Sequence, residues 1–109
     1  MNFEIVHNNG ENVAILHSAN VEIRDAQDAL EMLMNARYQE CEVLQVQQHH
    51  LPESFFDLKT GLAGEILLKF STYGGRLIVV GNFENITSKS LRDFIFESNK
   101  VGRIRFVSS

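Results

Sequence analysis

Alternation of apolar and polar residues at the start of the chain predicts a β-hairpin. Residues 2–7 alternate around apolar side chains, and residues 13–16 form a second apolar run. Between them, Asn9 and Gly10 supply two adjacent positions that tolerate a positive φ, which a tight hairpin turn requires. The pattern therefore indicates two antiparallel strands joined by a short turn.

Three segments place apolar residues at spacings of three and four, which is typical of one buried helix face. They span residues 24–37, about 60–73, and a stretch that Thr87 or Ser88 can cap and that runs to about Ser98. The predicted buried positions are Ala26, Ala29, Leu30, Leu33 and Met34 in the first helix, Leu62, Ala63, Ile66, Leu67 and Phe70 in the second, and Leu91, Phe94 and Ile95 in the third.

Three further apolar runs predict strands. Residues 43–46 indicate a half-buried strand, since glutamines surround the apolar positions, and residues 104–107 indicate a closing strand. Residues 77–80 are four consecutive β-forming side chains, which favours a central strand buried on both faces. Residues 51–56 are predicted to be a loop or a single helical turn, because Pro52 ends any strand.

The resulting order, β-β-α-β-α-β-α-β, predicts an α/β (α+β) fold in a single domain over residues 1–109. We expect a mixed sheet of about five strands with an N-terminal hairpin and helices packed on it. Loops that leave the carboxyl ends of parallel strands share one edge, where ligands tend to bind. That edge is predicted to gather residues 57–61 and 82–90, so that two helix N-termini face the same solvent.

Composition and charge narrow the function classes. Apolar residues make up 44% and charged residues 22% of the 109 residues, which is typical of a soluble globular domain. The net charge of −4, with no run of Lys and Arg along the chain, disfavours nucleic-acid binding. No apolar run is long enough to span a membrane and the first residues have no leader pattern, so we expect no membrane contact and a cytoplasmic location.

The sequence predicts no metal site, no cofactor and no catalytic residue. Adjacent His49 and His50 point to opposite sides of an extended segment, and no Cys or acidic pair stands at ligand spacing, so they are interpreted as a solvated loop pair. The single cysteine, Cys41, lies between two glutamates that oppose thiolate formation and is interpreted as an inert thiol. Phosphate-binding loops, dinucleotide fingerprints and nucleophile elbows are absent, so an enzyme is unsupported.

Two long motifs resemble a bacterial protein family. FFDLKTGLAGEILLKF, residues 55–70, and TSKSLRDFIFESNK, residues 87–100, are similar to the domain of unknown function 4180 family of small uncharacterised bacterial proteins. The similarity runs from the first predicted helix to the last strand. It implies no particular activity, because the family has none assigned.

At the level of fold, the element order resembles STAS domains of the anti-sigma-factor-antagonist type. In that group an Asp-Ser-Ser-Gly-Leu-Gly turn opens the second helix, and its second Ser accepts a phosphoryl group from a partner kinase. With one residue inserted, Asp57 matches the Asp, Thr60 the acceptor Ser, and Gly61-Leu62 the Gly-Leu. Lys59 with its preceding leucine replaces the first Ser, and alanine replaces the last Gly.

Candidate site residues therefore lie in two loops. Thr60, with Gly61, Asp57 and Lys59, forms a phosphoacceptor or anion site if the resemblance extends to function, because a helix N-terminus stabilises an added dianion. The alternative is that Thr60 only caps the helix. The second loop of the same face offers Ser88, Lys89, Ser90 and Arg92, with Arg92 as the anion clamp.

Three functions stay open on this basis. The leading prediction is a regulatory or protein-binding module of STAS-like fold, with an unidentified protein partner and a switch by phosphorylation at Thr60. The second is a small-molecule or anion-binding protein that uses the helix N-termini at the loop edge. The third is a structural homodimer held by a large apolar contact.

Overall fold

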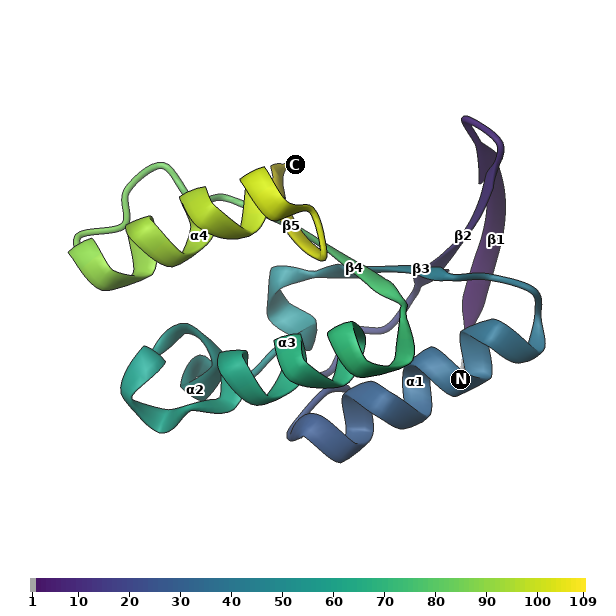
Figure 1. The fold of residues 1–109 in the computed structure, drawn as a ribbon, viewed down its shortest axis with the longest axis horizontal. Helices are drawn as coiled ribbons and strands as arrows, with labels where there is room; N and C mark the ends of the chain where they lie inside the picture. The colour runs from purple at the N-terminus through teal and green to yellow at the C-terminus, as the bar shows by residue number, and fades with distance from the viewer. Residues whose placement is uncertain (1) are drawn as a thin grey trace.

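The computed structural model describes residues 2–109. In chain order the elements are β1 (Phe3–Asn8), β2 (Glu11–Leu16), α1 (Ala26–Tyr38), β3 (Val43–Gln47), the short 3₁₀ turn η1 (Gln48–His50), α2 (Glu53–Phe56), a second 3₁₀ turn η2 (Leu58–Thr60), α3 (Leu62–Tyr73), β4 (Arg76–Gly81), α4 (Lys89–Val101) and β5 (Ile104–Ser108) (Figure 1).

The five strands lie in the sheet in the same order as in the chain. β1 pairs antiparallel with β2, and every later neighbour pairs parallel. This confirms the predicted mixed α/β fold with an N-terminal hairpin. The hairpin turn forms for the predicted reason, because Asn9 at φ 52° and Gly10 at φ 81° both adopt the left-handed conformation.

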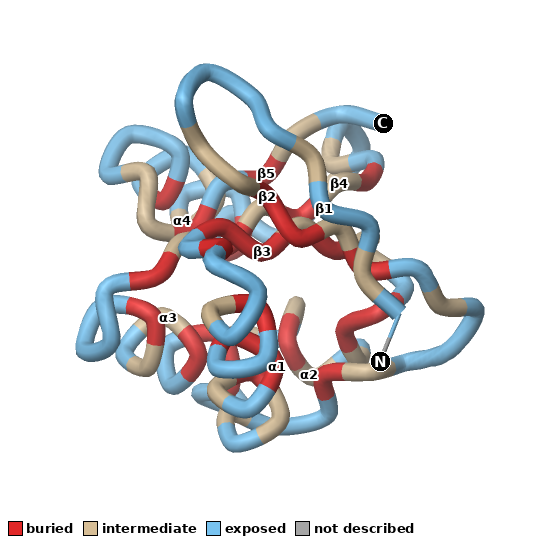
Figure 2. The backbone as a smooth tube through the Cα atoms, turned by 90° about the vertical axis from the view of Figure 1, so that its right-hand side faces the viewer, coloured by how far each residue is buried: buried red, intermediate tan, exposed pale blue. Residues whose placement is uncertain are grey.

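The helices pack on one face of this sheet. Ala14, Leu44, Leu77 and Ile104 are aligned across four strands, and all are fully buried. Right-handed crossovers between parallel strands in sequential order place the connecting helices on the same face. Figure 2 shows α1, α2 and α3 together on one side of the strands, with buried backbone between the two layers.

The opposite face explains one wrong prediction. β4 was expected to be buried on both faces, but Leu77 and Val79 are buried while Ile78 and Val80 are only half-buried. The reason is that, within residues 2–109, the helices cover the first side of the sheet and leave the second side to solvent. A continuous apolar run therefore does not identify a strand between two helical layers.

Helix ends follow local side-chain chemistry. Asp25 Oδ1 accepts from the Asp28 backbone N–H at 2.8 Å, and Asp28 Oδ2 accepts from the Arg24 backbone N–H at 3.0 Å, so both carboxylates cap α1. The hydrogen bond from the Arg24 backbone holds the pKa of Asp28 below its usual range. At α4, Ser88 Oγ accepts from the Leu91 backbone N–H at 3.2 Å, which confirms Ser88 as the cap.

The predicted boundary at Thr60 is corrected by two residues. α3 begins at Leu62 because Gly61 adopts φ 80° and Leu58–Thr60 form a separate 3₁₀ turn. Leu62, Ala63, Ile66 and Phe70 are buried as predicted. Within residues 2–109, none of the helices has both the length and the apolar character needed to cross a membrane.

The junction of α3 and β4 yields a stability prediction. A Cβ atom built at Gly75 would lie 2.5 Å from Leu33 Cδ1 and 2.8 Å from Leu33 Cδ2 of α1, and Leu33 is fully buried. Gly75→Ala should therefore lower the free energy of unfolding by about 1–3 kcal/mol through overpacking. Urea denaturation followed by far-UV circular dichroism measures the loss.

Gly64 is the matched control, because it lies on the exposed side of α3 with no atom within 4 Å of an added Cβ. Gly64→Ala should raise stability by roughly 0.5–1 kcal/mol, the difference in helix propensity. If Gly75→Ala is as stable as the unchanged chain, the close approach of Leu33 does not constrain the junction.

Candidate functional site

A hollow of about 520 Å³ lies where β3 and β4 end. It therefore occupies the carboxyl edge of the parallel sheet, which is the edge expected to bind ligands. Its lining combines amide, imidazole, carboxylate and hydroxyl side chains with three apolar ones and a glycine: Gln47, Gln48, His49, Leu51, Glu53, Phe56, Val80, Gly81, Asn82 and Ser109.

The 3₁₀ turn after β3 packs directly on the end of β4. Gln48 Oε1 accepts from the Asn82 backbone N–H at 3.1 Å. A Cβ at Gly81 would lie 2.4 Å from Gln48 Oε1 and 2.8 Å from Gln48 Cβ, so the close approach requires glycine. Gln48, which no sequence pattern singles out, thus holds the ends of β3 and β4 together at the hollow.

The prediction that His49 and His50 form a solvated pair is wrong for His50, which is buried. His50 is 1% exposed, and its Nδ1 accepts from the Gln47 backbone N–H at 2.9 Å. Its Nε2–H therefore donates to the Ser18 carbonyl at 2.9 Å, which fixes the neutral tautomer. The 3₁₀ turn directs His50 inward, whereas His49 stays exposed and approaches the same Ser18 carbonyl at 3.0 Å.

Thr60 lies exposed at the entrance to α3 with its hydroxyl engaged. Oγ1 donates toward the Ser54 carbonyl at 2.6 Å and has the Asp57 carbonyl at 2.9 Å. The same oxygen accepts from the Leu62 backbone N–H at 3.3 Å. The side chain therefore connects α2, η2 and the first residue of α3.

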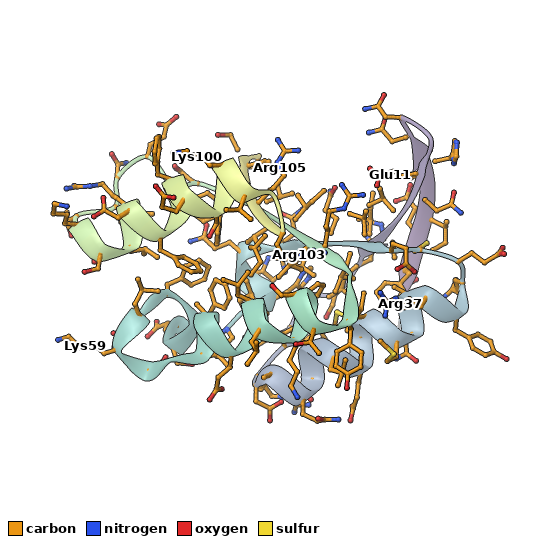
Figure 3. All side chains as sticks on the ribbon, in the orientation of Figure 1. Glu11, Arg37, Lys59, Lys100, Arg103 and Arg105 are labelled. Carbon is orange, nitrogen blue, oxygen red and sulfur yellow. The ribbon has the colours of Figure 1, made fainter. Side chains whose placement is uncertain are left out.

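The neighbours of Thr60 in the first loop have separate roles. Asp57 Oδ1 accepts from the Lys59 backbone N–H at 3.2 Å and so caps η2. Gly61 provides the left-handed residue that links η2 to α3. Figure 3 shows the Lys59 side chain at the far end of the molecule, pointing into solvent.

Most of the candidate residues in the second loop stabilise the start of α4. Ser88 is the helix cap, Lys89 pairs with Asp93 at 2.8 Å one turn later, and Ser90 is exposed. Arg92 Nη1 donates to the Ile86 carbonyl at 3.3 Å, so the guanidinium supports its own loop.

The two loops meet through aromatic rings and not through their polar side chains. Phe56 beside the first loop and Phe83 in the second have ring centroids 6.3 Å apart, and Phe83 packs edge-on against Phe106 at 5.4 Å. Among the described residues, neither Thr60 nor Arg92 lines the hollow. The predicted site residues therefore lie outside the lining of the hollow.

Charge sets what the hollow can bind. Its lining contains the Glu53 carboxylate and none of the lysines or arginines of residues 2–109, so it suits a neutral or cationic polar molecule better than an anion. No group of three potential metal-binding side chains occurs in that part of the chain either.

At the other end of the sheet, burial raises the pKa of the Cys41 thiol, and Glu40 and Glu42 raise it further.

The buried imidazole predicts a pH dependence of stability. Desolvation lowers the pKa of His50 in the native state, although the Ser18 carbonyl partly opposes this. Below about pH 6.5, the usual histidine pKa, the unfolded chain then binds a proton that the native chain binds only at lower pH. The free energy of unfolding should therefore be independent of His50 titration above that pH. It should fall on acidification, with a contribution from His50 of at most about 1.4 kcal/mol per pH unit.

Urea titrations between pH 5 and pH 8 measure this slope. His50→Asn should remove the His50 part of it, whereas His7→Gln, which changes an exposed histidine of β1, should retain it. An identical slope in the His50→Asn chain would contradict a buried neutral imidazole.

Comparison with known proteins identifies a protein family. The family model described as Domain of unknown function (DUF4180) matches residues 8–109. No curated protein and no solved structure matches the chain significantly. Because the match runs from the last residue of β1 to residue 109 and so includes both loops and the hollow, the chain belongs to the DUF4180 family.

Proposed function

We propose that the protein is a regulatory, protein-binding module of STAS-like fold, with phosphorylation of Thr60 as its switch. The observation that carries the proposal is the position of the Thr60 hydroxyl. It is exposed at the start of α3, yet it holds the Ser54 carbonyl at 2.6 Å. A change at this one oxygen therefore alters the contact between α2 and α3 on the surface.

The observed element order supports this proposal. A hairpin followed by three helix-strand units is the order that the STAS resemblance implies, and the Asp57-to-Leu62 turn opens α3 at the carboxyl edge of the sheet. A partner that binds there would contact a surface whose shape depends on η2.

Phosphorylation would act on two opposing sets of groups. The ester oxygen of a phosphothreonine has no proton, so the donation toward Ser54 and Asp57 is lost and the dianion is repelled by both carbonyl oxygens. The Leu62 N–H and the positive end of the α3 dipole attract the same dianion. The modified side chain should therefore turn from α2 toward the N-terminus of α3 and release η2.

The transfer requires a partner kinase with a bound nucleoside triphosphate. Thr60 Oγ1 forms the new bond to the γ-phosphorus, the bond to the nucleoside diphosphate breaks, and the hydroxyl proton passes to a base of the kinase. An exposed acceptor at a loop edge meets the steric requirement of this reaction.

Phosphopeptide mapping of the protein purified from its native host tests the proposal. We expect a phosphate on Thr60, and we expect Thr60→Glu and Thr60→Ala to retain different sets of partners in pull-downs. Unmodified Thr60 together with identical partners for all variants would refute the switch.

Two further variants separate signalling from loss of structure. Thr60→Ala should lose about 1 kcal/mol of stability with its hydrogen bonds, while Thr60→Ser keeps the hydroxyl and should behave like the unchanged chain. Thr72→Glu, an exposed threonine at the other end of α3, controls for the added charge. A change of partners with Thr72→Glu as large as that with Thr60→Glu would show a nonspecific charge effect.

The hollow supports a second candidate, a small-molecule-binding protein. A volume of about 520 Å³ at the carboxyl edge is in the range of ligand sites, and its Glu53 carboxylate favours a polar cation. Small organic amines should then raise the melting temperature of the protein, and Glu53→Gln should abolish the rise. If none of the small organic amines tested shifts the melting temperature, this candidate fails while the Thr60 proposal stands.

A further inference from the structure

A second cavity, of about 400 Å³, lies at the opposite end of the parallel sheet, where β4 and β5 begin. Three arginines line it, although the chain as a whole carries a net charge of −4. The other lining residues come from the end of α4 and the turn that follows it. The lining is Arg76, Asn99, Val101, Gly102, Arg103 and Arg105.

The fold brings these arginines together from segments about 30 residues apart. Arg76 is the first residue of β4, and the parallel register pairs Ile78 with Arg105 of β5. Because side chains alternate along a strand, Arg76, Ile78 and Arg105 share one face, the side that the helices leave uncovered. Arg103 precedes β5 in the adjoining turn and lines the same cavity.

Existing contacts neutralise only part of this charge. Arg76 forms an ion pair with Glu11 of β2. Arg103 Nη1 donates to the Gly75 carbonyl at 2.9 Å, which uses one of its five N–H groups. For Arg105 the structure gives neither an ion pair nor a hydrogen bond within residues 2–109. Two of the three positive charges are left without a counter-ion.

The remaining polar side chain of the lining is already satisfied. Asn99 Oδ1 accepts from the Phe106 backbone N–H at 2.7 Å, and Asn99 Nδ2 donates to the Phe106 carbonyl at 3.2 Å. Guanidinium N–H groups are therefore the free donors of the cavity. Guanidinium groups bind oxyanions through paired hydrogen bonds, and they do so better than any other side chain.

Structural contacts account for Arg76 and for one N–H group of Arg103, but not for Arg105. Arg37 illustrates the structural use, because it donates to the Tyr73 carbonyl at the end of α3 and pairs with Glu42. Arg105 does neither. Like charges that lie close together on one face are unfavourable, so the convergence of Arg103 and Arg105, which have no counter-ion, costs stability unless an anion compensates.

We propose that this cavity binds the phosphate group of a small molecule. A phosphate monoester carries about −1.5 to −2 charges at neutral pH and three acceptor oxygens. That charge matches the two unneutralised guanidinium groups, whereas a single carboxylate would satisfy only one. The site is distinct from Thr60 and the hollow, which lie at the other end of the strands, and it does not depend on the function proposed there.

Glu11 acts as an internal competitor in this site. Its carboxylate occupies Arg76, so an incoming phosphate must share or displace that ion pair. Removal of the Glu11 charge should therefore strengthen phosphate binding, while removal of the Arg105 charge should weaken it. Opposite signs would also follow from the change in net charge alone, so a charge removed far from the cavity serves as the control.

Titration of the full chain with inorganic phosphate tests the proposal, with chloride at equal ionic strength as the reference. Nitrogen–proton spectra of the arginine Nε–H groups should show saturable shifts for Arg76, Arg103 and Arg105. Arg105→Gln should raise the apparent Kd roughly tenfold, the effect of one lost charged hydrogen bond, and Glu11→Gln should lower it about threefold. Both variants change half-exposed or exposed side chains, so the fold should persist.

Arg24→Gln is the matched control, since it removes one exposed positive charge just before α1, which follows the carboxyl end of β2. It should leave the Kd unchanged. Equal weakening by Arg24→Gln and Arg105→Gln, or shifts that chloride reproduces, would overturn the site. Saturation by succinate but not by phosphate would overturn the choice of phosphate.

Glycerol 3-phosphate identifies the source of the phosphate group. Tighter binding of this ester than of inorganic phosphate supports an organic phosphate as the ligand. Equal affinity supports free phosphate through the same guanidinium contacts.

Discussion

The structure depends on one constraint, the packing of every strand-connecting helix against a single face of the sheet. Strands that follow one another in chain order leave each crossover helix on the same side as the last. That side supplies the core: Leu44, Leu77 and Ile104 of adjacent strands are fully buried beneath the helices. The opposite side has to remain compatible with solvent, which is why half-buried apolar residues and charged ones alternate with the core positions of the same strands.

A second consequence is that the two ends of the sheet differ in chemistry. Strand carboxyl ends lead into helix N-termini, so backbone N–H groups and hydroxyl caps gather there, as at Thr60 and Ser88. Strand amino ends follow helix C-termini, whose free carbonyls favour cations. Arg37 donates to the carbonyl of Tyr73, the last residue of α3, and Arg103 donates to the carbonyl of Gly75, just beyond the helix cap. Phe106 joins the two layers near the first end, since its ring contacts both Phe83 and Phe94.

Local patterns predicted most of the elements, and non-local placement explains what they missed. Turn and cap chemistry acts over a few residues, so Asn9-Gly10 and Ser88 could be assigned from sequence. The inward turn of His50 depends on a carbonyl more than thirty residues away, at Ser18, and no spacing rule reports it. The arginine cavity is similar, because Arg76 and Arg105 are neighbours only after β4 and β5 pair. Thr60 was selected from a local motif, and its contact with Ser54 required the fold.

The acidity of the whole chain does not oppose anion binding at that cavity. At physiological ionic strength charges are screened over about 8 Å, whereas the molecule extends 37 × 28 × 27 Å. Most of the carboxylates that give the net charge of −4 therefore contribute little to the potential between Arg76 and Arg105. Glu11 does contribute, because it forms an ion pair with Arg76. Net charge excludes long basic tracts such as those that follow a nucleic-acid backbone, but a site of molecular size is governed by the few charges within a screening length of it.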